Sequence, residues 1–347
     1  MSNPLRIGVL GLTHDHVWGN LQALQACTDA ELVAVAEPHQ ALRDHVRQEF
    51  GCEQLYDDYS DMLDNETLDA VYVFSDNLRG AELGTLAAER GLHILIEKPM
   101  ASTYAGAAQL YGAARAAGVV LMINWPILWW PAVQHALQLI NAGRIGQVFQ
   151  VNYRSAHGGP RELGCSTYFA EWLYDPRRNG AGALMDYCCY GAALTCALLG
   201  LPARVSAVSG RLFKPDLPSE DNAVLVMQHA RAISTSTASW TQSGEMTSYE
   251  PMIYGTTGTI MVRNHGSELW LANDEHPNGI ALEVPAIPAG SRDTAEYFVR
   301  HIRAGEQVRG LCSPEVGLMA QEVLEAGILA AAEERTISLP LPVSFLQ

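Results

Sequence analysis

A lysine at the end of an apolar run carries the strongest chemical signal in the sequence. Residues 93–96 are an apolar run, and Glu97, Lys98 and Pro99 follow at once. Such a run predicts a buried strand, and ligands of open α/β sheets bind at the carboxyl ends of the strands. A positioned ammonium can donate a hydrogen bond to a substrate hydroxyl, as hydride removal from a carbinol requires. We predict that Lys98 is catalytic, and that replacing it by Met abolishes turnover and leaves folding intact.

An acid and a phenol lie four residues apart later in the chain, which is the spacing of one helical turn. A glycine-rich stretch at residues 179–183 leads into an apolar run that contains Asp186 and Tyr190. Residues four apart lie on one face of a helix, so both side chains point the same way. A tyrosine hydroxyl beside the Lys98 ammonium would be a general acid/base. The alternative is a buried tyrosine that hydrogen-bonds Asp186, and the sequence leaves both possibilities open.

A glycine turn after the first predicted strand indicates a dinucleotide site. Gly11, Leu12, Thr13 and His14 follow the apolar run at residues 6–10 and precede a helical pattern. Backbone N–H groups of such a turn and the helix dipole can meet a pyrophosphate. Only Gly11 matches the Gly-x-Gly-x-x-Gly pattern, because Thr13 and His16 occupy its second and third glycine positions.

The cofactor type follows from the acid at the end of the second predicted strand. Glu37 ends the run at residues 32–36, where its carboxylate can hold a ribose 2′-hydroxyl and repel a 2′-phosphate. We therefore predict NAD, with NADP as the second possibility. His14 and His16 can be considered as metal ligands, but two exposed loop imidazoles beside Asp15 are better explained as polar loop residues. We predict no metal.

Two patterns of elements must position these residues. Up to residue 123 apolar strands alternate with helices, which predicts a doubly wound parallel sheet of the Rossmann type. From about residue 125 successive strands lack intervening helices, which predicts an α+β part with a large, mostly antiparallel sheet. The expected strands are 6–10, 32–36, 70–74, 93–96, 119–123, 148–154, 205–212, 223–228, 233–240, 248–254 and 259–263, and the expected helices are 81–90, a stretch up to 142, 293–304 and 314–334. The fold class is thus α/β, with domains at residues 1–123 and 124–347.

Composition excludes several classes of partner. The formal net charge is −16, from 22 Lys and Arg against 38 Asp and Glu, so neither nucleic acid nor an anionic membrane is expected to bind. No apolar stretch is expected to span a membrane. Seven cysteines, two of them adjacent at 188 and 189, predict reduced thiols and a cytoplasmic protein rather than a disulfide framework. Small molecules are the expected partners.

In these residues the chain resembles the Gfo/Idh/MocA oxidoreductase family over essentially its whole length. The resemblance rests, in family order, on the Gly11 turn, Glu37, residues 75–77 and 97–99, the stretch Asn-Ala-Gly-Arg-Ile-Gly at 141–146, and the Asp186 helix. It implies a catalytic lysine at Lys98, a substrate-holding Asp186, and a C-terminal sheet that builds homodimers or homotetramers. Many members have His at the position of Tyr190, and some have Tyr. The cofactor contacts that the resemblance implies come from Gly11, Leu12, Thr13, His14, Glu37, Ser75, Asn77, Glu97, Lys98, Asn124 and Trp125.

Substrate contacts are expected from the second domain. His157, Arg161, Tyr168 and Trp172 form a polar, aromatic connection that leads into the Asp186 helix. With Lys98, Asp186 and Tyr190, they would bind a hydroxylated or anionic substrate by charge-assisted hydrogen bonds and ring contact. The alternative is that they only stabilise a long loop.

The resulting hypothesis is an NAD(P)-dependent oxidoreductase that transfers a hydride between the nicotinamide and a carbinol of a sugar, polyol or related diol. A second hypothesis, motivated by the missing loop glycines, is a non-catalytic protein that senses nucleotide or sugar. A third is a lyase or glycosidase that retains NAD and oxidises its substrate only transiently.

Overall fold

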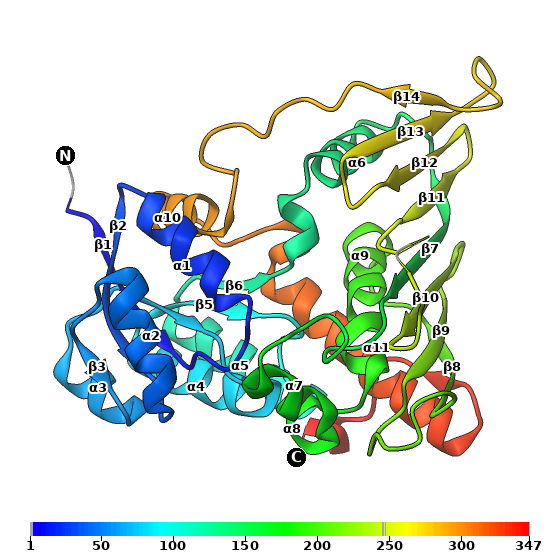
Figure 1. Ribbon diagram of the computed structural model, residues 1–347. Coiled ribbons are helices and arrows are strands. Elements are labelled where there is room, and N and C mark those ends of the chain that lie inside the picture. Colours follow the sequence, from blue (N-terminus) through cyan, green and yellow to red (C-terminus); the bar gives the residue numbers. More distant parts are fainter. Residues whose placement is uncertain (1–2, 245, 247, 347) are drawn as a thin grey trace.

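The computed structural model describes residues 3–244, 246 and 248–346, and its N-terminal part is built on a six-stranded parallel sheet (Figure 1). The strand order is β3-β2-β1-β4-β5-β6, so the chain reverses its direction of winding between β1 and β4. The strands are β1 Leu5–Leu10, β2 Ala30–Ala36, β3 Leu55–Tyr56, β4 Ala70–Val73, β5 His93–Glu97 and β6 Leu121–Asn124. The helices are α1 Val17–Ala26, α2 Gln40–Phe50, α3 Tyr59–Asn65, α4 Asn77–Glu89 and α5 Tyr104–Ala117.

The predicted Rossmann sheet is confirmed, with small differences at the ends of elements. All four residues of β4 are buried, as expected for a parallel strand covered by helices on both faces. The helix expected at 81–90 begins earlier, at Asn77, because the Asp76 carboxylate caps it by accepting the N–H of Arg79 at 2.8 Å. The two-residue strand β3 was not predicted, since two residues are too short to show a strand pattern.

A nine-stranded sheet forms the second part. Its order is β14-β13-β12-β11-β7-β10-β9-β8-β15. Among the described strands of this sheet, only β7 and β10 pair in parallel. The predicted mostly antiparallel sheet is therefore confirmed. The strands are β7 Val148–Ala156, β8 Arg204–Gly210, β9 Asn222–Gln228, β10 Ile233–Ser239, β11 Met252–Gly255, β12 Gly258–Arg263, β13 Glu268–Ala272, β14 Ile280–Leu282 and β15 Ile337–Ser338.

Three short strands of this sheet were not predicted, and several strand boundaries differ from the expected ones. β13, β14 and β15 lie at or near the sheet edges and were missed, because short edge strands give little periodic signal. The strand expected at 248–254 begins only at Met252. Tyr249, within the expected strand, has a backbone φ of 57°, which is not an extended conformation.

Helices α9 (Cys189–Leu199) and α11 (Pro314–Glu333) of the second part lie between its sheet and the first part. In Figure 1, α9 and α11 run along the face of the nine-stranded sheet that looks toward the Rossmann sheet, and α11 also contacts α5 while α10 packs on α1. The C-terminal helices therefore return to the first part of the chain. The elements are α6 Pro131–Asn141, α7 Thr167–Tyr174, α8 Pro176–Asn179, a π-helical turn η2 Leu184–Cys188, α9 Cys189–Leu199, α10 Thr294–Ala304 and α11 Pro314–Glu333, with short 3-10 turns η1 Pro126–Trp129, η3 Gly310–Cys312 and η4 Val343–Leu346.

One helical segment corrects the expectation that no apolar stretch is long enough to span a membrane. Residues Pro176–Leu199, which span α8, η2 and α9, form a 24-residue segment that qualifies by length and composition. Within the fold, 83% of its apolar window is buried, so the segment is a core helix of this structure.

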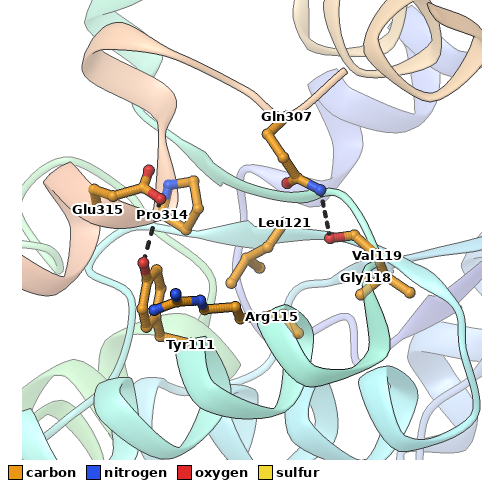
Figure 2. Close-up of a pocket in the computed structure, with 9 residues that line it drawn as sticks. Tyr111, Arg115, Gly118, Val119, Leu121, Gln307, Pro314 and Glu315 are labelled. Atoms are coloured by element: carbon orange, nitrogen blue, oxygen red, sulfur yellow. Dashed lines mark hydrogen bonds between the residues drawn. The ribbon is translucent and has the colours of Figure 1, made fainter. Parts of the chain in front are cut away.

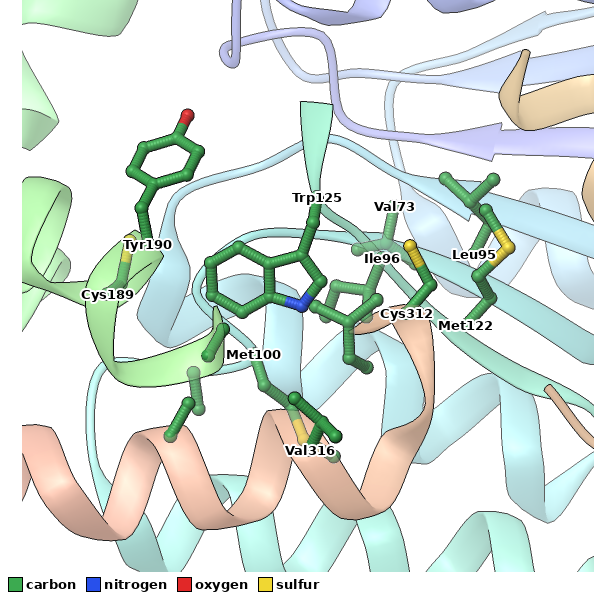
Figure 3. Packing of buried hydrophobic residues seen from close by; sticks show 14 of the residues in the cluster. Val73, Leu95, Ile96, Met100, Met122, Trp125, Cys189, Tyr190, Cys312 and Val316 are labelled. Carbon is green, nitrogen blue, oxygen red and sulfur yellow. The ribbon is translucent and has the colours of Figure 1, made fainter. Parts of the chain in front are cut away.

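The indole of Trp125 joins the two parts. Trp125 directly follows β6 and is completely buried, as Figure 3 shows, between Tyr190 of α9 on one side and Ile96 of β5 and Cys312 on the other. Its ring meets that of Tyr190 edge-on at 5.9 Å between centroids. Trp125, expected from the sequence to contact the cofactor, thus packs in the core, and this packing fixes Tyr190 relative to the end of β5.

Candidate active site

A buried ion pair joins the two parts at the carboxyl edge of the parallel sheet. Lys98 directly follows β5, and its Nζ lies 2.8 Å from Asp186 Oδ1, in the π-helical turn η2. The side chains are 3% and 6% exposed. The Trp240 indole donates to the other Asp186 oxygen at 3.1 Å, and the Lys98 ammonium also donates to the Asp186 carbonyl at 3.2 Å. Residues predicted from distant segments therefore meet in one site.

The burial of this pair changes the expectation that Lys98→Met leaves the fold intact. Removing one partner of a buried, hydrogen-bonded pair leaves the other charge uncompensated, which costs about 3–5 kcal/mol. The variant is therefore expected to lose stability as well as activity.

The lysine is held in its charged form. Burial disfavours the ammonium, but Asp186, with smaller effects of Tyr190 and Cys189, outweighs burial and raises the pKa of Lys98 well above its usual range. Lys98 is consequently a hydrogen-bond donor at neutral pH.

Tyrosines surround the ammonium. Lys98 Nζ lies 4.8 Å from the centroid of the Tyr190 ring and 6.0 Å from that of Tyr187. Tyr190 and Tyr187 each pack edge-on against Tyr249, with centroid separations of 5.7 and 5.6 Å. Burial raises the pKa of Tyr190 well above its usual range, although Lys98 acts in the opposite direction. Tyr190 is thus a neutral phenol next to the ion pair, not a phenolate.

Three residues of this site were not foreseen from the sequence. Tyr187 and Tyr249 supply rings, and the Trp240 indole donates to the Asp186 carboxylate. Tyr249 has a left-handed backbone conformation, which is strained for a bulky residue and is found most often at functional sites. Tyr187 could have been suspected from its position beside Asp186, whereas nothing in the local sequence points to Tyr249 or Trp240.

His157, a predicted substrate contact, lies beside these tyrosines. Its ring meets Tyr187 edge-on at 4.6 Å between centroids. Burial lowers the pKa of His157 to about 4, so the ring is neutral at neutral pH. Nδ1 accepts the Gly159 N–H at 2.7 Å, which leaves the proton of the neutral ring on Nε2. His157 is therefore a hydrogen-bond donor through Nε2.

The other predicted substrate contacts lie elsewhere. The Arg161 guanidinium is exposed and lies over the Tyr174 ring at 4.7 Å. Tyr168 packs on His39, which follows β2, and the Trp172 indole donates to the Thr13 carbonyl at 3.2 Å. Helix α7 thus places Tyr168 and Trp172 against the predicted cofactor segments rather than beside Lys98.

The Gly11 turn has the backbone that a dinucleotide loop needs. Gly11 has φ of 85°, and a Cβ there would lie 3.0 Å from the Ser75 backbone nitrogen, so a side chain would be strained and crowded. Within the described residues no hydrogen-bond acceptor meets the N–H of Thr13 or Asp15, and α1 begins just beyond. These amides and the helix N-terminus fit a pyrophosphate.

Glu37 supports this loop from the end of β2. Its fully buried carboxylate accepts the Leu12 N–H at 2.7 Å and the His39 N–H at 2.9 Å. The acid thus stands at the position predicted for a ribose contact, and it also ties the end of β2 to the loop.

The remaining predicted cofactor residues gather at the ends of β4, β5 and β6. Ser75 lies against Gly11, and the Asn77 amide donates to Asn179 Oδ1 at 2.8 Å. The Glu97 carboxylate accepts the Asn124 amide and the Lys98 N–H. These residues border the cofactor loop, apart from Trp125, whose side chain lies in the core.

The interpretation of His14 and His16 as two exposed loop imidazoles is wrong for His14. Its side chain is 1% exposed and packs on Phe169 at 4.5 Å between ring centroids, because α7 covers the loop. The Ser166 N–H and hydroxyl hold α7 on the loop by donating to the Asp15 carboxylate at 2.7 and 2.6 Å. His14 and His16 also approach Glu97, at 3.8 and 3.2 Å from its Oε2.

Among the hollows near the Rossmann sheet, two lie at its opposite edges. One of about 310 Å³ is next to the site and is bordered by His16, Asn20, Asn124, Trp129 and Thr294. The other, of about 370 Å³, is bordered by Tyr111, Arg115, Gln307 and Glu315 (Figure 2). Gly118 and Val119 place this second hollow at the beginning of β6, at the edge of the sheet opposite to Lys98.

Comparison with known proteins identifies the family. A model described as the NAD-binding Rossmann fold of the Gfo/Idh/MocA oxidoreductases matches residues 5–125, and the model of the family's C-terminal domain matches residues 133–261. The chain therefore belongs to the Gfo/Idh/MocA oxidoreductase family, as the sequence motifs indicated, and its first domain is that family's NAD-binding domain.

Similar proteins with assigned activities act on sugars. The chain is 30% identical to D-xylose 1-dehydrogenase (NADP(+)) 2 of Haloferax volcanii, over 59% of this chain and 60% of that protein. It is 26% identical to D-apiose dehydrogenase of Paraburkholderia graminis, over 96% of this chain and 88% of that protein. Its fold resembles that of levoglucosan dehydrogenase in complex with NADH and levoglucosan, with a TM-score of 0.83 and 21% identity over 98% of this chain and all of that one.

Proposed function

We propose that the protein catalyses reversible hydride transfer between NAD and a carbinol carbon of a sugar, a polyol or a related diol. The observation that carries the proposal is the buried Lys98–Asp186 pair at the carboxyl edge of an NAD-binding Rossmann sheet. The activities of the xylose and apiose dehydrogenases support the substrate class.

The cofactor residues that we propose are those of the loop and of the strand ends. The amides of Thr13 and Asp15 would hold the pyrophosphate, and Glu37 would favour the free ribose hydroxyls of NAD over the 2′-phosphate of NADP. When bound, the nicotinamide supplies the hydride acceptor or donor.

The charge states of these groups support a role for each of them. The Lys98 ammonium binds and orients the substrate oxygen, and Asp186 holds that ammonium in place. Tyr190 exchanges the hydroxyl proton as a neutral phenol, and His157 donates from Nε2 to another hydroxyl. Because these donors are protonated at neutral pH, the site is arranged to give a proton to a carbonyl oxygen in the direction of reduction.

The surroundings favour a neutral, polyhydroxylated substrate. Tyr187, Tyr190 and Tyr249 offer ring surfaces, and the donors at Lys98 and His157 match hydroxyl oxygens. Arg161 is engaged by Tyr174 outside the site, so the charge that would select an anionic substrate is not supplied there.

We further propose a homodimer or homotetramer in the cytoplasm. Apolar residues are exposed on the nine-stranded sheet, among them Phe149, Val208, Val224, Val226 and Ile233, and no described helix covers that side in Figure 1. The seven cysteines are all free thiols, which suits a reducing compartment.

The test is a screen of aldoses, polyols and diols with NAD, in which NADH formation and the sugar product are both measured. Substrate-dependent NADH in stoichiometric amount supports the proposal. Product without net NADH indicates transient oxidation, and nucleotide binding without product from any substrate indicates a sensor. Asp186→Asn should abolish turnover, whereas Asp64→Asn, at an exposed ion pair, should not.

A further inference from the structure

Two imidazoles and a carboxylate converge beside the proposed catalytic pair. One ligand atom from each of His14, His16 and Glu97 lies within 4.8 Å of the other two. His14 follows β1, His16 precedes the first turn of α1, and Glu97 ends β5. The backbone N–H of His14 donates to the Phe74 carbonyl, which directly follows β4, the strand between β1 and β5. This hydrogen bond fixes the His14 backbone at the carboxyl edge of the sheet.

The separations suit ligands of one small ion. Glu97 Oε2 lies 3.2 Å from His16 Nδ1 and 3.8 Å from His14 Nε2. Two ligands bound tetrahedrally at about 2.0–2.1 Å from a zinc ion are about 3.3 Å apart. His16 Nδ1 is buried and, among the described residues, has no hydrogen-bond partner although the carboxylate is so near. Its nitrogen is therefore available as a ligand for an ion.

The carboxylate has the outer support that a metal ligand usually has. The Asn124 amide donates to Glu97 Oε1, and the Trp129 indole in turn donates to Asn124 Oδ1 at 3.0 Å. Such outer partners orient metal ligands. Glu97 is only 4% exposed, and the nearest ammonium, Lys98, is already paired with Asp186. A buried carboxylate without a full charge partner is the kind that coordinates a cation.

An ion can reach this group from solvent. The His16 side chain is 37% exposed, and the 310 Å³ hollow is bordered by His16 and by Asn124, which donates to Glu97. Three protein ligands leave at least one coordination position for an oxygen from water or from a bound molecule.

We propose that His14, His16 and Glu97 form a binding site for one divalent transition-metal ion, with zinc the best match to two imidazoles and a carboxylate. Zinc accepts this ligand set in tetrahedral geometry, whereas magnesium and calcium prefer oxygen ligands alone. This proposal departs from our prediction of no metal. It does not depend on the proposed hydride transfer, and its test requires no turnover.

The test uses untagged full-length protein, stripped with a chelator and given one equivalent of zinc before desalting and elemental analysis. About one zinc per chain is expected to remain in the wild type. His16→Asn is expected to lower the affinity by more than about 100-fold, since loss of even an outer partner costs about 10–100-fold. His39→Asn is the matched control, because His39 also contacts a buried glutamate, Glu37, but belongs to no such cluster. It should bind zinc like the wild type.

Cobalt gives a second, independent measurement. Cobalt(II) bound in place of zinc should show the intense visible absorption of a tetrahedral site, and His16→Asn should remove it. His16 is the most exposed of the three ligands, so this variant is expected to fold, which circular dichroism checks. Failure of the wild type to retain zinc, or equal retention by His16→Asn through the cysteines, would overturn the proposal.

Discussion

Replacing Lys98 by Met should lower the free energy of unfolding of the protein. Adding Asp186→Asn to that variant should largely restore it. With Lys98 removed, Asp186 keeps only the Trp240 indole and the surrounding backbone as partners in a site that is 6% exposed. Stranding one charge of such a pair costs about 3–5 kcal/mol. The whole fold is stable by only about 5–15 kcal/mol, so the loss is readily measured.

The double variant isolates the pair. When Lys98→Met and Asp186→Asn are combined, no buried charge is stranded, so the double variant should be at least about 2 kcal/mol more stable than the sum of the single changes predicts. Equilibrium unfolding in urea, followed by fluorescence of the seven tryptophans and by circular dichroism, measures each corner of the cycle. All three variants should be inactive.

A surface pair with the same separation is the control. Arg90 and Asp64 are also 2.8 Å apart, but their side chains are 30% and 62% exposed. The corresponding cycle with Arg90→Met and Asp64→Asn should show a coupling of about 0.2–1 kcal/mol. A Lys98–Asp186 coupling as small as that of the surface pair would refute the assignment of a buried, mutually dependent pair.

Three further predictions concern the cofactor and pH. Glu37→Gln should lower the preference for NAD over NADP by at least about tenfold, measured by calorimetric titration with both nucleotides, because it removes a charge from the proposed ribose site; an unchanged ratio would remove Glu37 from nucleotide selection. His157 has a pKa of about 4 in the fold. The unfolded chain, with its ordinary histidine pKa of about 6.5, then binds the proton more readily, so stability is fully present above about pH 6.5 and falls by up to about 3 kcal/mol as pH drops toward 4. Unfolding of wild type and His157→Gln at several pH values measures this, and identical pH dependence of the two would contradict it. Because the pKa values of Lys98 and Tyr190 are raised, kcat/KM for oxidation should increase about tenfold per pH unit between about pH 6 and 9, and a flat profile would exclude both as the proton acceptor.

The positions of the strand ends could be predicted from the sequence, because the buried strands of a parallel sheet appear in it as apolar runs. Lys98, Glu37 and Gly11 each follow such a run, so their common edge of the sheet could be inferred before any coordinates. The meeting of Lys98 with Asp186 was also inferable in outline, since both types of residue suit one site. The distance between these two side chains and their burial could not be inferred from the sequence.

Contacts between distant segments account for what was missed. The burial of His14 comes from α7, whose position depends on the Asp15–Ser166 hydrogen bonds across 151 residues. The roles of Tyr249 and Trp240 likewise arise from sheet pairing far from the motif that contains Asp186. Local periodicity carries no information about such contacts, and so it could not reveal that two loop histidines face Glu97.

The most direct test of the account follows the transferred hydrogen. A sugar or polyol that passes the substrate screen is labelled with deuterium at the carbinol carbon and incubated with NAD, and the NADH is analysed by mass spectrometry. Direct hydride transfer predicts NADH about one mass unit heavier, with the label on the nicotinamide ring. Oxidised product accompanied by unlabelled NADH, or by no NADH, would contradict hydride transfer between this substrate carbon and the cofactor.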